Sequence, residues 1–169
     1  RPSGPGHPSR VAAGIRHPSK MVFIPIHWAM DSFMSLSQFK TFFWPPFRKV
    51  LLGLIEAGLV PVAFWESTCT TRLEVIADIP RGKAIYWFEG TDMVRAKEVL
   101  GDVVCIRGNV PASMLNTGTP QEVDAYCRML IEKIGKGGGF ILDGACGIPD
   151  EARPENVKAM YASVRKYGA

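Results

Sequence analysis

The chain has 169 residues, of which 47% are apolar, so it is the size of roughly one domain and has enough apolar material for a core. Its formal net charge is +4, from 20 basic and 16 acidic residues. Four of the basic residues, Arg1, Arg10, Arg16 and Lys20, precede position 21, so the remainder is close to neutral. This balance argues against a nucleic-acid-binding surface.

The cysteines stand at positions 69, 105, 127 and 146 and show no Cys-x-x-Cys spacing. With no signal peptide recognised ahead of them, we expect reduced thiols and a cytoplasmic location rather than a disulfide framework. The most hydrophobic run, from Val50 to Trp65, is too short for a bilayer and is interrupted by an acid, a glycine and a proline. The sequence therefore predicts no membrane span.

Residues 1–20 are rich in proline, glycine, serine and basic residues and lack apolar periodicity. This composition is typical of a disordered lead-in, in which His7 and His17 are solvated rather than bound to a metal. We expect residues 21–169 to form one domain.

The first part of that domain begins with a strand over Val22–Ile26. A helix is predicted over Ser35–Ala57 in two pieces, because Pro45 and Pro46 remove backbone donors from its middle. Leu59–Trp65 is a nearly continuous apolar run, which is typical of a parallel strand covered on both faces.

The rest of the chain repeats the same alternation of helix and strand. We expect a helix over Thr71–Ile79, a strand over Lys83–Phe88, a helix over Asp92–Leu100, a strand over Val103–Arg107, a long helix capped by Thr119, a strand over Phe140–Leu142 and a last helix from about Pro154. Connections of at least ten residues predict parallel strands with crossover helices. The fold class is therefore α/β, about half of an eight-stranded (β/α) barrel. Half a barrel leaves a sheet edge and an inner face uncovered, which suggests a fragment of a longer protein or an obligate partner, for which a homo-oligomer is one candidate.

In a (β/α) barrel the active site lies at the carboxyl ends of the strands. Polar residues gather at these predicted ends: His27, Asp31, Glu66, Cys69, Glu89, Asp92, Asn109, Asp143 and Cys146. Four of them have a structural alternative. Asp92 is placed to cap a helix, Asn109 to form a turn and His27 to serve as a structural histidine. Cys146, between Gly144 and Gly147, is either a functional thiol or a small apolar residue that fills a bend.

Glu66, Cys69 and Cys146 are candidate ligands for Zn²⁺, which takes thiolates and carboxylates in tetrahedral geometry. Glu-x-x-Cys is not a recognised ligand spacing, so the pattern alone favours no metal. The glycine-rich stretch 135–139 is not a phosphate-binding loop, because it lacks the lysine ending and precedes a strand.

Three stretches carry a family resemblance: TDMVRAKEVLGD (91–102), GNVPASMLNTGTPQEV (108–123) and GGGFILDGACGIPDEARPENVKAM (137–160). Together they resemble the C-terminal half of the uroporphyrinogen decarboxylase superfamily, with similarity from about Val22 to Gly168. The superfamily includes the heme-pathway decarboxylase and the methyltransferases that serve corrinoid proteins. Its fold is a single (β/α)8 barrel, so the resemblance implies the same architecture as the alternation of elements.

The resemblance implies different chemistry for the two branches. The decarboxylase pattern Asn-Leu-Gly-His-Gly-Ile is replaced here by residues 143–148, Asp-Gly-Ala-Cys-Gly-Ile, so Cys146 stands where the porphyrinogen-contacting histidine would be. The methyltransferases bind zinc through a His-x-Cys pair and a later cysteine. Cys146 falls on the later cysteine, whereas the pair falls on residues 66–68, with Cys69 one position further.

The resemblance thus implies a zinc-dependent transfer of a methyl group from a small methylated donor to a separate corrinoid protein. Glu66, Cys146 and, less clearly, Cys69 would hold the zinc, His27 would act in catalysis, and Asp92 and Asn109 would shape the pocket. The alternatives are metal-free and cofactor-free decarboxylation of uroporphyrinogen, as in heme biosynthesis, and a non-catalytic half barrel.

Overall fold

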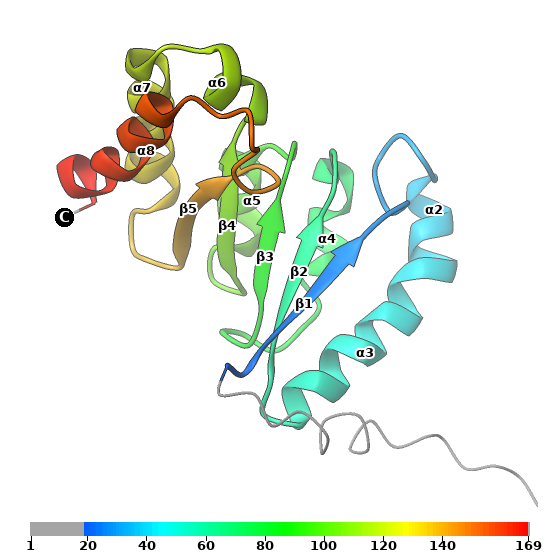
Figure 1. Ribbon diagram of the computed structural model, residues 1–169. Helices are drawn as coiled ribbons and strands as arrows, with labels where there is room; N and C mark the ends of the chain where they lie inside the picture. Colours follow the sequence, from blue (N-terminus) through cyan, green and yellow to red (C-terminus); the bar gives the residue numbers. More distant parts are fainter. Residues whose placement is uncertain (1–18, 169) are drawn as a thin grey trace, which may run out of the picture.

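The computed structural model describes residues 19–168, in which five strands alternate with helices (Figure 1). Residues 1–18 of the predicted lead-in lie outside the described residues. The strands are β1 (Met21–Ile26), β2 (Val60–Trp65), β3 (Ile85–Phe88), β4 (Cys105–Val110) and β5 (Phe140–Gly144). The α-helices are α2 (Leu36–Gln38), α3 (Trp44–Glu56), α4 (Leu73–Ile76), α5 (Met93–Leu100), α6 (Ala112–Thr117), α7 (Pro120–Ile134) and α8 (Pro154–Tyr167).

The strands form one parallel sheet in the order β1-β2-β3-β4-β5. Strand order follows chain order, so each helical connection crosses over to the next neighbouring strand, as the alternation predicted. The Val60 N–H donates to the carbonyl of Lys20 at 2.8 Å, which extends the β1–β2 pairing beyond the start of β1. β1 and β5 are the edge strands of this sheet.

The two faces of the sheet differ because side chains alternate along each strand. One face, which includes Ala63, Tyr86 and Ile106, belongs to the core formed with the helices. The other face carries Phe64 and Trp87, whose ring centroids are 4.8 Å apart and which lie outside that core cluster. On this second face Phe23, in edge strand β1, is 55% exposed. Phe64 and Trp87 are only 8% and 9% exposed, so the uncovered face expected of a partial barrel is seen at its β1 edge, at Phe23, and not at these two rings.

The helix over residues 36–56 is not interrupted at its two prolines. A π-helical segment, Phe39–Phe43, follows α2 and leads directly into α3, whose first turn holds Pro45 and Pro46. The first turn of a helix needs no backbone donors, so the prolines mark where the regular α-helix begins. The prediction of a break is corrected in this respect, because the chain remains helical across the junction.

None of the helices within residues 19–168 has the length and apolar character required to cross a membrane. All four cysteines are free, as the absence of paired spacing predicted.

Candidate functional site

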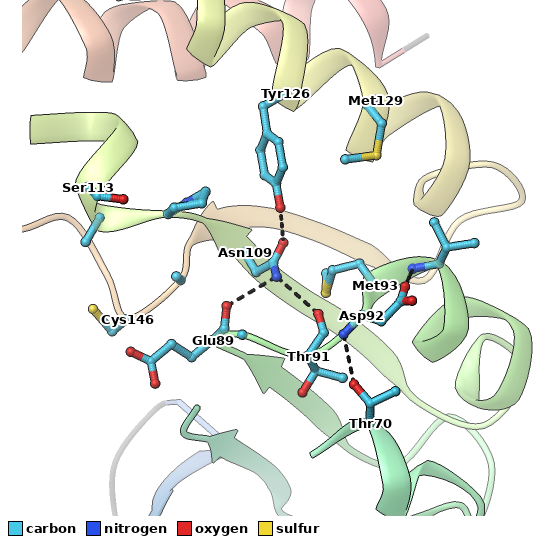
Figure 2. Close-up of a pocket in the computed structure, with 15 residues that line it drawn as sticks. Thr70, Glu89, Thr91, Asp92, Met93, Asn109, Ser113, Tyr126, Met129 and Cys146 are labelled. Carbon is cyan, nitrogen blue, oxygen red and sulfur yellow. Dashed lines mark hydrogen bonds between the residues drawn. The ribbon is translucent and has the colours of Figure 1, made fainter. Parts of the chain in front are cut away.

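The carboxyl ends of the parallel strands meet at one edge of the sheet, where the arrowheads of Figure 1 point. A cavity of about 710 Å³ lies at this edge, over the ends of β3, β4 and β5 and beside α5, α6 and α7. Its lining includes Cys146 and three other polar strand-end residues of the predicted set, Glu89, Asp92 and Asn109. Figure 2 shows Tyr126 reaching down from α7 towards Asn109 in the middle of the site.

Asn109 is buried on β4, and its side chain connects this strand with the end of β3 and with α7. Its side-chain amide donates to the carbonyls of Glu89 and Thr91 at 3.2 and 3.3 Å, and its carbonyl oxygen accepts from the Tyr126 hydroxyl at 3.0 Å. Burial raises the pKa of Tyr126, so its hydroxyl remains a donor at neutral pH. Asn109 therefore lines the cavity and connects the elements around it, so it does more than form a turn, and its part in the reaction stays a prediction.

Asp92 is the N-cap of α5. One carboxylate oxygen accepts from the backbone N–H groups of Val94 and Arg95 at 2.9 and 3.1 Å. The capping interpretation of Asp92 is thus confirmed, and the same residue also lines the cavity. Its carboxylate accepts hydrogen bonds from free N–H groups at the start of the helix. This fixes Asp92 in place and suits it to form part of the cavity wall.

Glu89 reaches the cavity from the end of β3. One carboxylate oxygen, Oε2, accepts from the Ser67 N–H at 2.5 Å, and the Gly90 N–H donates to the Ser67 carbonyl at 2.9 Å. The two loops that follow β2 and β3 are therefore tied together directly at the site.

His27 and Glu66 form a pair at the ends of β1 and β2 and are not part of the cavity lining. His27 Nδ1 lies 2.6 Å from Glu66 Oε2, and the two residues follow the neighbouring strands β1 and β2. An ionised carboxylate only accepts hydrogen bonds, so Glu66 favours a proton on Nδ1 and leaves Nε2 as the second ring nitrogen. The predicted catalytic histidine is thus oriented by one of the predicted metal ligands.

Cys69 lies beneath the surface, with 1% of its area exposed. Its sulfur is 3.1 Å from the Thr91 hydroxyl, and burial raises the pKa of the thiol to about 12. A protonated, buried thiol is a poor metal ligand, because metals bind the thiolate. In this structure Cys69 packs against the core instead of facing a ligand.

The three predicted zinc ligands are not brought together. Glu66 contacts His27, Cys69 contacts Thr91, and Cys146 lies on the wall of the cavity. Across residues 19–168, no three or more His, Cys, Asp or Glu side chains are grouped so that they could hold a metal ion. The donor set as predicted does not fit zinc in this structure.

Cys146 is exposed and lines the cavity just beyond β5. The bend that presents it requires glycine: a Cβ on Gly144 would lie 1.9 Å from the carbonyl oxygen of Gly147, and Gly147 itself has φ of +101°. The glycines therefore allow the backbone to fold tightly on itself. Cys146 does not fill the bend as a buried residue.

The sequence pattern did not single out Arg72, although this residue connects the segments that follow β1 and β2. It is 1% exposed, pairs with the Asp31 carboxylate and donates to the carbonyls of Met30 and Met34. Asp31 also accepts from the Thr71 hydroxyl at 2.7 Å. Arg72 stands in an ordinary helix-start sequence, Thr-Thr-Arg-Leu-Glu, so no sequence signal marks its burial.

Comparison with known proteins gives the family. A family model described as uroporphyrinogen decarboxylase (URO-D) matches residues 15–167. Among curated relatives, a uroporphyrinogen decarboxylase from Psychromonas ingrahamii is 30% identical over 162 residues, which cover 94% of this chain and 43% of the relative. One from Pseudoalteromonas translucida is 32% identical over 126 residues, covering 72% of this chain and 35% of the relative.

A solved methyltransferase from Methanosarcina mazei superposes with a TM-score of 0.71 at 24% sequence identity, over 88% of this chain and 42% of that protein. This likeness supports the assignment of the sheet and helices to part of a (β/α)8 barrel. The chain spans less than half of the length of these relatives. On the family match over residues 15–167, the chain belongs to the uroporphyrinogen decarboxylase (URO-D) family.

Proposed function

We propose that the chain takes part in methyl transfer from a small methylated donor to a corrinoid carried by a separate protein. The observation that supports this most is the position of Cys146. It exposes a thiol to the cavity at the end of β5, where the decarboxylase pattern has histidine and the methyltransferase pattern has cysteine. The methyltransferase likeness of the fold is compatible with this proposal.

The cavity suits a small donor. Its volume, about 710 Å³, lies in the range of small-molecule sites, and its wall combines apolar side chains such as Met93 and Met129 with the polar group of Asn109. Asn109 already uses both ends of its amide within the protein, so it fixes the shape of the cavity.

In such a transfer the bond between the donor heteroatom and its methyl carbon breaks, and the carbon bonds to the Co(I) ion of the acceptor. The cobalt supplies both electrons of the new bond and becomes Co(III), while the leaving group takes up a proton. His27 lies outside the lining of the cavity, so its proposed part is to pass a proton towards the leaving group from the neighbouring strand end, where Glu66 orients its ring.

Zinc enters this proposal through the family resemblance. Cys146 is exposed on the cavity wall and Glu66 is oriented towards His27, whereas Cys69 is withdrawn from the surface. The resemblance implies about one zinc per chain, whereas the separated side chains within residues 19–168 do not fit a zinc site, and elemental analysis of protein purified without chelator decides between the two. The role of Cys146 at the cavity is proposed independently of that result.

A second candidate is decarboxylation of a porphyrinogen. It is favoured by the curated relatives, which are named uroporphyrinogen decarboxylases and reach 30% identity over 94% of this chain. Against it stands Cys146 in place of the histidine of the decarboxylase pattern.

One pair of assays separates the two candidates. The protein is incubated with cob(I)alamin and each of methanol, methylamines and methoxylated aromatics, and methylcobalamin is followed by its absorbance. In parallel, loss of carboxylates from uroporphyrinogen is followed by chromatography. Methylation of cob(I)alamin without decarboxylation supports the proposal, whereas decarboxylation alone replaces it with the second candidate.

A further inference from the structure

The outer side of β1 is one of the two free edges of the sheet within residues 19–168 (Figure 1). The strand has the sequence Met-Val-Phe-Ile-Pro-Ile and carries no charge. Its side chains Met21 and Phe23 are 58% and 55% exposed. Proteins protect free sheet edges with charges, bulges, prolines or a covering segment, and β1 itself supplies only Pro25. It therefore offers an apolar edge with little protection against a further strand.

The other free edge, β5, has a matching character. Its one charged side chain, Asp143, is occupied within the protein, because its carboxylate pairs with Arg107 and accepts from the Gly144 N–H. Ile141 on the same strand is 39% exposed. This edge, too, presents an apolar side chain and no charge that lacks a partner.

A groove of about 780 Å³ runs beside β5. Its lining combines the strand residues Ile141 and Leu142 with Ile131 of α7 and Val164 of α8. Consecutive residues of a strand point to opposite faces of the sheet, so a groove lined by both Ile141 and Leu142 lies along the free edge of the strand. Side chains of an added strand could enter this groove.

The occupant that fits the β5 edge is an uncharged apolar strand that runs parallel to β5, and this chain has such a strand at its other edge. A two-fold rotation about an axis along the strands keeps their direction. It places β1 of a second copy beside β5 and, at the same time, β5 of the second copy beside β1. Both free edges are then covered by two identical junctions, and neither edge brings an unpaired strand charge to oppose association.

The register of the sheet shows which side chains such a junction joins. Registered neighbours share a face, and this places Phe23 on the same face as Ile141. At the junction Phe23 of the second copy therefore lies on the side of Ile141. Val22 and Ile24 of the second copy alternate with it and point towards the groove beside α7 and α8.

We propose that two copies of this chain pair β1 with β5 at both edges and so form a closed ring of ten parallel strands. Closure leaves no free edge in the sheet. It also covers the apolar side chains that each edge exposes. This assembly is inferred from the fold and does not depend on the proposed function.

The closed ring changes which residues share a site. Within one chain, His27 follows β1 and Cys146 lies beyond β5, at opposite edges of the sheet. In the ring, His27 of the second copy follows the strand that lies next to β5. Each site thus combines Cys146 of one copy with His27 of the other. This consequence, unlike the assembly, rests on the proposed function.

Sedimentation equilibrium of the full chain tests the assembly. The unmodified protein should have twice the mass of one chain. Phe23→Lys and Ile141→Lys each place a charge at an exposed position of one edge, so they can fold as monomers, which circular dichroism verifies. The control is Phe42→Lys, because Phe42 is 74% exposed but lies in the π-helical segment, outside both strands.

We expect Phe23→Lys and Ile141→Lys each to weaken dimerisation by about 100-fold or more, because each dimer buries the new charge twice. Phe42→Lys should leave it unchanged. The double variant Phe23→Lys with Ile141→Glu should recover dimerisation relative to Phe23→Lys, because lysine then meets glutamate at both junctions. A contact between two β1 strands would place lysine against lysine and would gain nothing from the second substitution.

Four results overturn the assembly: a monomer at about 100 μM, oligomers that grow beyond the dimer, a dimer that Phe23→Lys leaves intact, and no recovery in the double variant. None of them affects the proposed function, which is measured by methylation of cob(I)alamin. If the unmodified protein fails to methylate cob(I)alamin, the proposed function fails, and the mass still decides the assembly.

Mixing two inactive variants tests the shared site. In a dimer of one His27→Ala chain and one Cys146→Ala chain, one junction keeps both residues and the other loses both. After random exchange of subunits, about a quarter of the unmodified methyl-transfer activity should return. No recovery in mixed dimers overturns the sharing of the site between copies, while the masses of the edge variants still decide whether the ring forms.

Discussion

The guanidinium of Arg107 on β4 and the carboxylate of Asp143 on β5 form an ion pair across neighbouring strands, with Nη2 and Oδ2 2.5 Å apart. The guanidinium also lies over the ring of Trp87 at 3.9 Å, and the Trp87 indole donates to the Gly144 carbonyl at 2.9 Å. Asp143 stands where the decarboxylase pattern has asparagine. The pair and the Trp87 contacts thus link three strands on the inner face and hold β5, beyond whose end Cys146 lies.

Loss of this ion pair should destabilise the protein. Asp143→Ala leaves a half-buried guanidinium without its partner, so we expect the free energy of unfolding to fall by about 1–3 kcal/mol, as measured by urea denaturation. The control is Glu132→Ala, which removes an exposed pairing with Arg128 on one helix and should cost about 0.5 kcal/mol or less. Equal effects of the two substitutions would contradict the structural role of the Asp143 pair.

Asn156 also connects separate elements of the fold, and it is fully buried in the first turn of α8. Its amide donates to the carbonyls of Met114, Leu115 and Gly118, at 3.3, 3.0 and 2.9 Å, and so attaches α8 to the end of α6. Asn156→Ala should lower the free energy of unfolding by about 2–3 kcal/mol, because several buried carbonyls lose their donor. Glu155→Ala, at the exposed neighbouring position, is the matched control and should change it by about 0.5 kcal/mol or less.

The chemical reactivity of the cysteines should follow their surroundings. Cys146 is exposed, while Cys69 and Cys127 are buried and burial raises the pKa of both thiols. In the folded protein at pH 8, iodoacetamide should therefore modify Cys146 first, as followed by mass spectrometry of peptides. Faster modification of Cys69 would show that the loop after β2 is open in solution.

The raised pKa of Cys69 also predicts a loss of stability at alkaline pH. The folded thiol keeps its proton up to a pKa of about 12, whereas in the unfolded chain it ionises near its ordinary pKa of 9.0. The unfolded state therefore releases the proton first, so stability present below pH 9 declines as the pH rises from 9 towards 12. Cys69→Ser keeps a hydroxyl beside Thr91 and removes this titration. Its stability should fall less between pH 8 and pH 10.5, and an identical fall in both proteins would contradict the prediction.

The strands and their order could be predicted from the sequence, because apolar runs such as Leu59–Trp65 alternate with amphipathic segments. The capping role of Asp92 was also predictable, since capping is a local interaction. The strand-end position of Asn109 was sufficient to place it at the cavity, although its contacts to Tyr126 depend on how α7 packs.

What the sequence could not provide is the direction in which each loop folds back. Cys69 is three residues from Glu66, yet the loop after β2 carries its thiol inward to Thr91, while Glu66 turns to His27. The burial of Arg72 and the exposure of Trp28 arise from the same tertiary packing. No pattern of residue types at short spacing records such long-range contacts.

Substitution of Cys146 tests whether this residue serves methyl transfer at the strand ends. The measurement is the rate of methylation of cob(I)alamin, with the donor that the unmodified protein uses, for Cys146→Ala and for Cys105→Ala, a half-buried cysteine on β4, as control. We expect Cys146→Ala to lower this rate by about 100-fold or more and Cys105→Ala to leave it within a few-fold. Full methyl transfer by folded Cys146→Ala protein would contradict this role of Cys146.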